Sequence, residues 1–254
     1  MAGIEIGIIG GTGGMGAWFA EFFKREGYVV HVSGRRTGLG ITALAGRCDV
    51  VIVSVPIDAT LGVIEQAGPF VREEALFMDF TSLKAEPVRA MLAHSRSEVI
   101  GLHPLFGPDV ASAEGQNIVY CPVRTKRWLP WLLDVLGRSG ARLKEATPEK
   151  HDGMMALVQG LNHLNTITLG LALREAGVTS AELEDFSTPI FRTKMAFVDK
   201  VFRGNPGLYA EIITGNRHIG GVVELYERQL ARVRTLIGRR DAASLAALIG
   251  EDEK

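Results

Sequence analysis

Short, nearly continuous runs of Val and Ile alternate with longer amphipathic stretches through the first half of the chain. Such runs are typical of strands in a parallel sheet covered on both faces, because neither side of such a strand meets water. The predicted strands are Ile4–Ile9, Tyr28–Ser33, Asp49–Val55, Ala75–Phe80, Glu98–Leu102, Gln116–Cys121 and Ala141–Glu145. The predicted helices between them are a stretch that ends at Glu26, then Ala59–Ala67, Lys84–Ala93 and Lys126–Ser139. This alternation predicts a doubly wound α/β domain with a Rossmann-type parallel sheet.

The segment between the second and third predicted strands departs from this alternation. It is rich in glycine and too short for a full crossover helix with its loops. We expect this crossover to be a turn or one short helix.

The pattern changes near residue 147. Thr147 and Pro148 form a good helix start, with Thr as the N-cap residue and Pro in the first turn. No convincing strand follows, and the predicted helices are Pro148–Ala176, Ala181–Phe186, Pro189–Phe202, Pro206–Ile237 and Asp241–Ile249. We therefore expect an α/β domain of residues 1–146 and an all-α domain of residues 147–254. The first long helix is apolar on several sides, which predicts a homodimer formed through the all-α domain.

Composition bounds the classes of function. The 254-residue chain is 46% hydrophobic and 22% charged, with a formal net charge of −1 and a pI of about 6.6. This charge gives no basic field for nucleic acid or an anionic membrane. No apolar run reaches about 18 residues, which argues against a membrane helix or a signal peptide. The two cysteines, Cys48 and Cys121, match no metal-ligand pattern, so we expect a cytoplasmic location without disulfide or metal.

A glycine-rich turn follows the first predicted strand. Gly11, Gly13 and Gly16 match the G-x-G-x-x-G pattern where the strand gives way to a helix. One glycine makes the tight turn, one lets backbone N–H groups approach a pyrophosphate, and one lets helix and strand pack closely. The helix N-terminus adds unpaired donors and a partial positive charge. We expect an oxidoreductase whose dinucleotide contacts Gly11, Thr12, Gly13, Gly14, Met15 and Gly16.

The end of the second strand bears on the choice of dinucleotide. NAD-selective folds place an Asp or Glu there to accept hydrogen bonds from the ribose. This chain has Ser33, Gly34, Arg35 and Arg36 instead, with no acidic residue before Asp49. Guanidinium groups bind phosphate oxygens with two parallel hydrogen bonds, so the sequence favours NADP over NAD. In the alternative interpretation both arginines are only solvent-exposed side chains of a loop, and NAD can still serve as the cofactor.

Two polar side chains follow neighbouring strands in the middle of the sequence. Ser82 comes after the strand that ends at Phe80, and His103 comes after the strand that ends at Leu102. Ligands of doubly wound folds bind beyond the carboxyl ends of the strands, so both side chains should face one crevice. Histidine is the side chain best suited to accept a proton near neutral pH. Taken alone, a histidine at a strand end is more often a structural hydrogen-bonding group.

Several segments, in order across both halves, resemble the prephenate dehydrogenases of the tyrosine pathway. The most specific is the run Gly101-Leu102-His103-Pro104-Leu105-Phe106-Gly107-Pro108-Asp109. The others are Ile8–Gly16, Val53–Ile57, Thr81–Lys84, Glu149–Asp152, Val158–Leu161, Ser187–Arg192 and Asn205–Ile212.

The resemblance implies a dinucleotide-binding domain followed by a helical substrate and dimerisation domain. It implies oxidation of prephenate at its ring hydroxyl, with loss of carbon dioxide, to give 4-hydroxyphenylpyruvate. In that family pattern His103 takes the hydroxyl proton as hydride passes to the nicotinamide, and Ser82 lies near both. The turn of Val55 and Pro56 matches a cofactor-binding segment.

The same resemblance assigns substrate contacts in the helical half. His163 matches a histidine that contacts the substrate side chain, although by itself it reads as a core histidine. Tyr209 matches an aromatic position at the substrate site, and a helix-packing role fits it nearly as well. Relatives commonly carry an arginine for the substrate carboxylate at the position of Lys200. Lys keeps the charge without the planar two-pronged hydrogen bonding, so Lys200 binds more loosely, Arg192 or another cation takes part, or the preferred substrate differs. Arg192 could equally be structural.

Three alternatives remain at this stage. Arogenate or a 4-amino-4-deoxy analogue of prephenate could be the substrate. A non-catalytic nucleotide-sensing protein could keep the fold, but it would not need Ser82 and His103. A β-hydroxyacid dehydrogenase would use a lysine at the start of the long interdomain helix, where Lys150 stands, but Glu149 and His151 around it follow the prephenate pattern.

Overall fold

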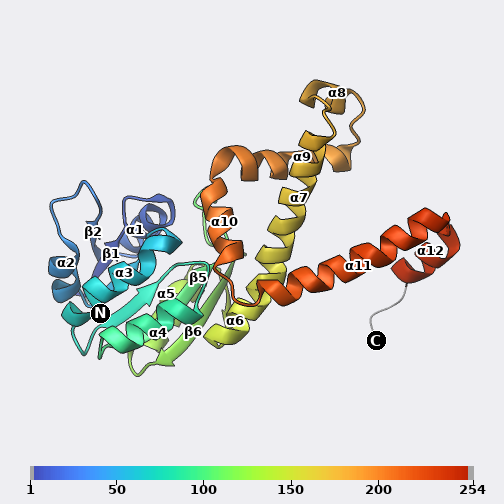
Figure 1. Cartoon of the computed structure of the whole chain (residues 1–254). Coiled ribbons are helices and arrows are strands. Elements are labelled where there is room, and N and C mark those ends of the chain that lie inside the picture. Colours follow the sequence, from blue (N-terminus) through green and yellow to red (C-terminus); the bar gives the residue numbers. More distant parts are fainter. Residues whose placement is uncertain (1–2, 251–254) are drawn as a thin grey trace. The chain divides into compact units, whose positions relative to one another are not determined.

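The computed structural model describes residues 3–250 and contains one seven-stranded sheet (Figure 1). Its strand order is β2-β1-β3-β4-β5-β6-β7. The strands are β1 (Glu5–Ile9), β2 (Val29–Ser33), β3 (Val50–Val53), β4 (Leu76–Asp79), β5 (Glu98–Pro104), β6 (Asn117–Arg124) and β7 (Arg142–Glu145). All seven predicted strands are present.

The sheet is parallel from β2 to β5, and then its direction reverses. β6 pairs antiparallel with β5, and β7 runs parallel to β6. The sequence pattern predicted a parallel sheet, so the direction of these two strands corrects that expectation. The reason is the connection, because a loop without a crossover helix joins β5 to β6 and returns the chain along the strand it has just left.

Helices cover both faces of the sheet. Alternate strand residues point to opposite faces, so Ile6 and Ile8 pack in one core while Val51 and Val53 pack in the other. The first core includes α1 (Gly14–Arg25) and α5 (Trp128–Arg138). The second includes α2 (Ile41–Arg47), α3 (Ile57–Ala67) and α4 (Ala85–His94). The predicted doubly wound α/β architecture is confirmed, and its short crossover is α2.

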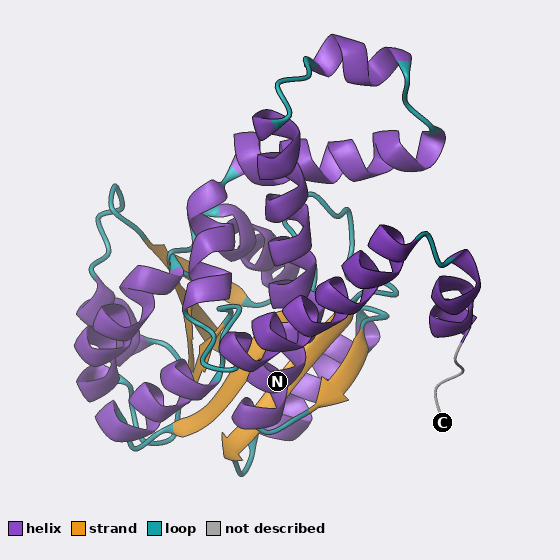
Figure 2. Cartoon of the chain, turned by 45° about the vertical axis from the view of Figure 1, so that its right-hand side comes forward, coloured by secondary structure: helices purple, strands orange, loops and turns teal. Residues whose placement is uncertain are grey.

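Beyond β7 the described chain holds helices and loops without a strand (Figure 2). The α-helices are α6 (Pro148–Met155), α7 (Asn162–Glu175), α8 (Ser180–Asp185), α9 (Pro189–Asp199), α10 (Pro206–Thr214), α11 (Ile219–Arg239) and α12 (Ala242–Gly250). π-helical segments at Ala156–Leu161 and Lys200–Gly204 continue α6 into α7 and extend α9.

The helix predicted over Pro206–Ile237 is two helices in the structure. α10 ends at Thr214 and α11 begins at Ile219. The buried side chain of Asn216 accepts the backbone N–H of His218 at 2.9 Å, which satisfies a donor at the start of α11. Gly215 stands between them, and a Cβ there would lie 2.9 Å from Leu83 Cδ1, so the chain packs closely at the point where α10 ends.

The chain divides into two compact units. One contains the sheet and extends through Met155, and it also includes Ala210–Gly215. The other contains Ala156–Tyr209 and the chain from Asn216 onward. Within residues 3–250, no helix combines the length and the apolar character needed to cross a membrane.

Candidate active site

The glycine turn between β1 and α1 forms a close backbone approach. A Cβ on Gly16 would lie 2.4 Å from the carbonyl oxygen of Gly10, and one on Gly11 would lie 2.6 Å from Val32 Cγ1. Gly13 is exposed and forms the N-cap of α1 without a side-chain cap, and its nearest neighbour to a Cβ is 3.4 Å away. Two glycines therefore allow tight packing and the third leaves backbone donors accessible, which fits a pyrophosphate.

This turn stands where the order of strands reverses. The chain goes from β1 to β2 on one side and then to β3 on the other, so the carboxyl ends of β1 and β3 flank a topological switch point. Gly10 has φ of +84°, and a Cβ there would lie 2.0 Å from the backbone oxygen of Ser54. Val55 and Pro56 follow Ser54 directly, so these two predicted cofactor residues lie beside the glycine turn.

The two arginines after β2 occupy the centre of a tight turn. Thr37 N–H donates to Gly34 C=O at 3.1 Å, which places Arg35 and Arg36 at the two central positions. The Thr37 hydroxyl accepts Gly34 N–H at 2.8 Å and so fixes the turn. Both arginine side chains are exposed, whereas Ser33 is buried and donates its hydroxyl to Leu39 C=O at 2.7 Å. Ser33 therefore shapes the loop, and the arginines are the groups that face solvent.

His103 lies near the end of β5 within a buried chain of polar side chains. Its Nδ1 is 2.8 Å from Nε2 of His151, and Nδ1 of His151 is 2.8 Å from Oδ1 of Asp152. The three residues are 3%, 1% and 5% exposed, respectively. Burial, with the nearby His151 and Lys84, holds the pKa of His103 well below its usual value, so its ring is neutral near pH 7.

Asp152 links α6 to the start of α4. Its Oδ1 accepts the backbone N–H of Lys84 at 2.8 Å, and its Oδ2 accepts that of Ala85 at 2.9 Å. These are unpaired donors at the first residues of α4, where the helix also carries partial positive charge. Burial raises the pKa of Asp152, but the hydrogen bonds from His151, Ala85 and Lys84 outweigh it, so the pKa lies below its ordinary value. Asp152 is therefore a carboxylate.

A buried ion pair supports the same region. Lys84 and Asp79 are both fully buried, and Lys84 Nζ pairs with Asp79 Oδ2. Nζ also donates to the carbonyl oxygen of Leu102 at 3.0 Å, directly before His103. The end of β4, the start of α4 and the end of β5 are thus joined by one cation.

Ser82 leaves the sheet at the same edge as His103. β4 and β5 pair in parallel with Asp79 opposite Gly101, so Ser82 lies just beyond the carboxyl end of β4 and His103 lies in the last two residues of β5. Ser82 is partly buried. Among the described residues no hydrogen bond joins it to His103, so the structure brings the two to one edge of the sheet without a direct hydrogen bond.

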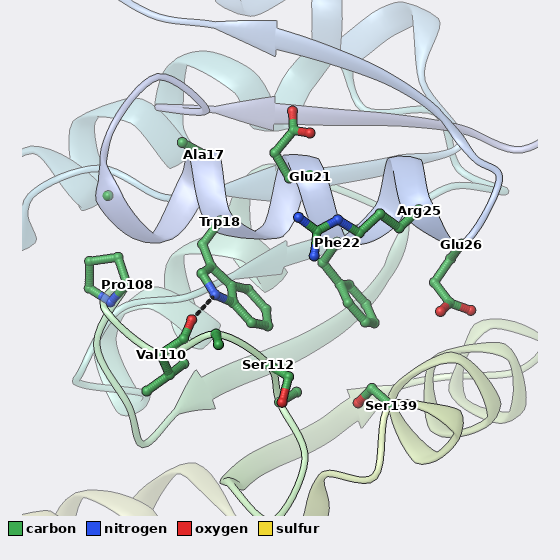
Figure 3. Close-up of a pocket in the computed structure, with 13 residues that line it drawn as sticks. Ala17, Trp18, Glu21, Phe22, Arg25, Glu26, Pro108, Val110, Ser112 and Ser139 are labelled. Atoms are coloured by element: carbon green, nitrogen blue, oxygen red, sulfur yellow. Dashed lines mark hydrogen bonds between the residues drawn. The ribbon is translucent and has the colours of Figure 1, made fainter.

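The loop that follows His103 packs against α1. Figure 3 shows Trp18 Nε1 donating to Val110 C=O, at 2.9 Å, beside a pocket of about 590 Å³. The Trp18 ring also meets Phe106 edge to face, with centroids 5.2 Å apart. Gly14 borders the pocket opposite Pro108, whose Cγ would lie 3.0 Å from a Cβ at Gly14. Helix α1, which follows the glycine turn, is therefore held against the loop that follows His103.

The helical unit brings two predicted substrate residues together. The rings of His163 and Tyr209 meet edge to face, with centroids 4.8 Å apart at 71°. Burial lowers the pKa of His163. Within residues 3–250, no hydrogen bond, ion pair or ring contact joins Arg192 or Lys200 to them. Arg192 Nε pairs with Glu184 Oε1 at 2.7 Å on the surface, while Lys200 is exposed at the end of α9.

Sequence reasoning assigned no role to His151, Asp152 or Lys84. His151 and Asp152 belonged only to a matching motif at a helix start, and Lys84 to a matching strand-end motif. The helix itself gave no clear signal, because its first turn also carries the exposed Glu149 and Lys150, and nothing in the pattern marks His151 and Asp152 as the buried polar residues. The residues that satisfy them lie 48 and 68 positions away, and no spacing rule reaches that far.

Comparison with known proteins decides the family. The family model of the prephenate dehydrogenase nucleotide-binding domain matches residues 19–145, and that of the prephenate dehydrogenase dimerization domain matches residues 147–251. This chain belongs to the prephenate dehydrogenase family. The resemblance inferred from its motifs is confirmed.

Members of the family with similar sequences or folds come from distant organisms. A probable arogenate/prephenate dehydrogenase of Methanocaldococcus jannaschii is 34% identical over 99% of this chain and 60% of its own length. The T-protein of Haemophilus influenzae is 34% identical over 93% of this chain and 63% of its own length. The chain thus spans less than two thirds of these curated relatives. The crystal structure of A. aeolicus prephenate dehydrogenase with hydroxyphenyl propionate and NAD+ has a TM-score of 0.76 at 19% identity, covering 99% of this chain and 96% of that one, which shows the shared fold.

Proposed function

We propose that this chain catalyses the NADP- or NAD-dependent oxidative decarboxylation of prephenate to 4-hydroxyphenylpyruvate, a step of tyrosine biosynthesis. The observation that carries the proposal is the ring of His103. It is neutral and buried at the carboxyl end of a sheet strand, its Nδ1 is bonded to His151, and its Nε2 remains for a substrate hydroxyl. A neutral imidazole in this position can accept the proton that leaves the hydroxyl.

The glycine turn would hold the pyrophosphate of the dinucleotide, whose nicotinamide would supply the hydride acceptor for the carbon that bears this hydroxyl. His103 takes the hydroxyl proton on Nε2 at the same time. Ser82, at the same sheet edge, is proposed to orient the hydroxyl toward this ring. Loss of the ring carboxylate as CO2 makes the product aromatic, so no protein group needs to drive the reaction forward.

In the helical unit, His163 and Tyr209 are proposed to contact the substrate side chain. Lys200 is proposed as the cation for a substrate carboxylate in preference to Arg192. The support is the surface ion pair of Arg192 with Glu184, which engages the guanidinium through Nε. Within residues 3–250, Lys200 forms no ion pair or hydrogen bond, so its ammonium is available.

NADP is proposed as the preferred cofactor. The acceptor for a ribose hydroxyl is missing at the end of β2, and Arg35 and Arg36 stand there on a turn fixed by Thr37. Two exposed guanidinium groups would bind a 2′-phosphate, and an NAD ribose would find no carboxylate.

We further propose a cytoplasmic homodimer, with residues 1–146 binding the cofactor and residues 147–254 binding substrate and the second copy. The dimerisation family model supports the second role. Large apolar side chains of this half are uncovered in the single chain, with Phe186 at 90% and Ile190 at 73% exposure. Cys48 and Cys121 are both buried free cysteines, and free cysteines are common in proteins of reducing compartments.

The test is turnover of the purified protein with prephenate and with arogenate, each against NADP and NAD. We expect prephenate with NADP to give the highest kcat/KM. His103→Asn should bind cofactor normally and lose about 10²- to 10⁴-fold in kcat, the usual contribution of general acid–base catalysis. His94→Asn, which removes an exposed histidine at the end of α4, is the matched control and should turn over normally. No turnover of either substrate, or near-normal turnover by His103→Asn, would refute the proposal.

A further inference from the structure

His103, His151 and Asp152 form a buried chain whose order of hydrogen bonds can be read atom by atom. Asp152 is a carboxylate and can only accept, so Nδ1 of His151 must donate to it. Burial lowers the pKa of His151, against the opposing effect of Asp152, so the ring is neutral and carries a single N–H. That N–H is on Nδ1, and Nε2 of His151 is therefore an acceptor.

The assignment of His151 determines that of His103. Because Nε2 of His151 accepts, Nδ1 of His103 must carry the proton and donate across the 2.8 Å contact. His103 is neutral, so its remaining nitrogen, Nε2, holds a lone pair. Without this chain, a free imidazole exchanges between both tautomers, and only one of them can accept a proton at Nε2.

We infer that Asp152 and His151 are positioning residues which hold His103 in the Nδ1–H tautomer and in a fixed ring orientation, so that Nε2 is ready to accept the substrate proton. The inference rests on the proposed function for the use of that proton. The tautomer itself follows from the contacts of the chain.

The anchoring of Asp152 explains why the arrangement is rigid. Both of its carboxylate oxygens accept backbone N–H groups at the start of α4, so the side chain cannot rotate away from His151 without leaving these donors unpaired. The edge-to-face contact of the two imidazoles, with centroids 5.0 Å apart at 65°, restricts rotation of the second ring. The backbone donors at the start of α4 thus fix Asp152, Asp152 fixes His151, and His151 fixes the orientation of His103.

The charges around the chain favour the same arrangement. Lys84 lies close to both rings and disfavours a second proton on either, and Asp79 pairs with that cation. When His103 takes the substrate proton, its Nδ1–H remains bonded to His151, whose own N–H points to the Asp152 carboxylate. The negative charge at the far end then stabilises the imidazolium as it forms.

Asp152→Asn is the variant that separates this role from packing. An Asn that turns its amide N–H toward His151 gives up the bond from Lys84 N–H and moves the proton of His151 to Nε2 and that of His103 to Nε2 as well. The opposite orientation gives up the bond from Ala85 N–H and keeps the parental tautomer, so the NMR measurement reports which orientation the variant takes. In triads built on the same logic, this change leaves the geometry and lowers kcat by about 10⁴-fold, because the tautomer is wrong. Glu149→Gln is the matched control, since it removes a carboxylate from the same helix at an exposed position.

The experiment has two measurements. Nitrogen NMR of histidine-labelled protein near pH 7.5, with the His103 signals assigned through His103→Asn, reports the tautomer without substrate. We expect Nδ1–H in the parent and in Glu149→Gln, and Nε2–H in Asp152→Asn. Steady-state kinetics should show a kcat loss of about 10²-fold or more in Asp152→Asn, with KM within about threefold and Glu149→Gln at parental rate.

An Nε2–H tautomer of His103 in the parent overturns the inference, even if Asp152→Asn does not fold. So does a folded Asp152→Asn protein that takes the Nε2–H tautomer of His103 and still has the parental kcat. If neither prephenate nor arogenate is turned over, the proposed function fails, and the NMR result still decides the role of Asp152 and His151.

Discussion

Removal of the buried ammonium of Lys84 tests how the sheet unit is held together around the site. Lys84→Met keeps an unbranched apolar stem of similar length and removes the charge. The Asp79 carboxylate would then remain fully buried without its cation, and Leu102 C=O would lose the Nζ donor at 3.0 Å.

The expected cost follows from these contacts. Breaking a buried ion pair by removal of one partner costs about 3–5 kcal/mol, because the remaining charge is uncompensated. Thr81 still donates its backbone N–H, at 3.1 Å, and its hydroxyl to Asp79 Oδ2, which offsets part of the loss. We therefore expect about 3 kcal/mol, a change of roughly 10²-fold in the folding equilibrium.

Urea unfolding followed by tryptophan fluorescence measures this loss of stability in the unit that contains the sheet. The three tryptophans, Trp18, Trp128 and Trp131, all lie in the sheet unit. The matched control is Arg89→Met, on the same helix, whose ion pair with Glu86 has side chains 59% and 57% exposed. Exposed pairs contribute about 0–1 kcal/mol, so this control should unfold almost as the parent does.

The double variant Asp79→Leu/Lys84→Met completes the test. It removes both charges, so it should recover much of the stability that Lys84→Met loses. If Lys84→Met costs less than about 1 kcal/mol, or if the double variant is less stable than the single one, the assignment of this pair as a buried, mutually compensating ion pair is wrong.

Four further outcomes are expected. NADP should give a higher kcat/KM than NAD. Arg35→Ala should reduce the difference in activation free energy between the two cofactors by about 1.5–3 kcal/mol, the value of a hydrogen bond to a charged group. Equal kcat/KM values of the parent with NAD and NADP would contradict this. Gly16→Ala should cost about 1–3 kcal/mol in urea unfolding and weaken NADP binding in a fluorescence titration, because its Cβ would lie 2.4 Å from the Gly10 oxygen. The pKa values of His103 and His151 are lower in the folded chain than in the unfolded one, so the free energy of unfolding should be highest above a pH of about 6.5 and should decrease as the pH falls below it. Urea titrations at several pH values measure this decrease, and it should be smaller in His103→Asn. Light scattering at micromolar concentration should give twice the 27.5 kDa chain mass, through an apolar interface of roughly 2,000 Å² or more, and an active monomer would refute the dimer.

The sequence determined the features that depend on local pattern. Runs of Val and Ile indicated the strands, and glycine spacing indicated the turn between β1 and α1. The position of His103 at a strand end, together with the motif around it, indicated the family and the proton acceptor that we propose. These features are readable because each depends on residues close together in the chain, where periodicity and backbone sterics act.

Tertiary structure alone decided what distant segments do to one another. The reversal of β6, the break between α10 and α11, and the burial of Lys84 against Asp79 all depend on packing. The clearest case is Asp152, whose carboxylate lies in α6 while its backbone donors lie at the start of α4. A buried carboxylate must find donors, but the sequence does not say which of many unpaired N–H groups will lie next to it. That choice is made only when the helices pack, and here it fixes the hydrogen bonds of His103.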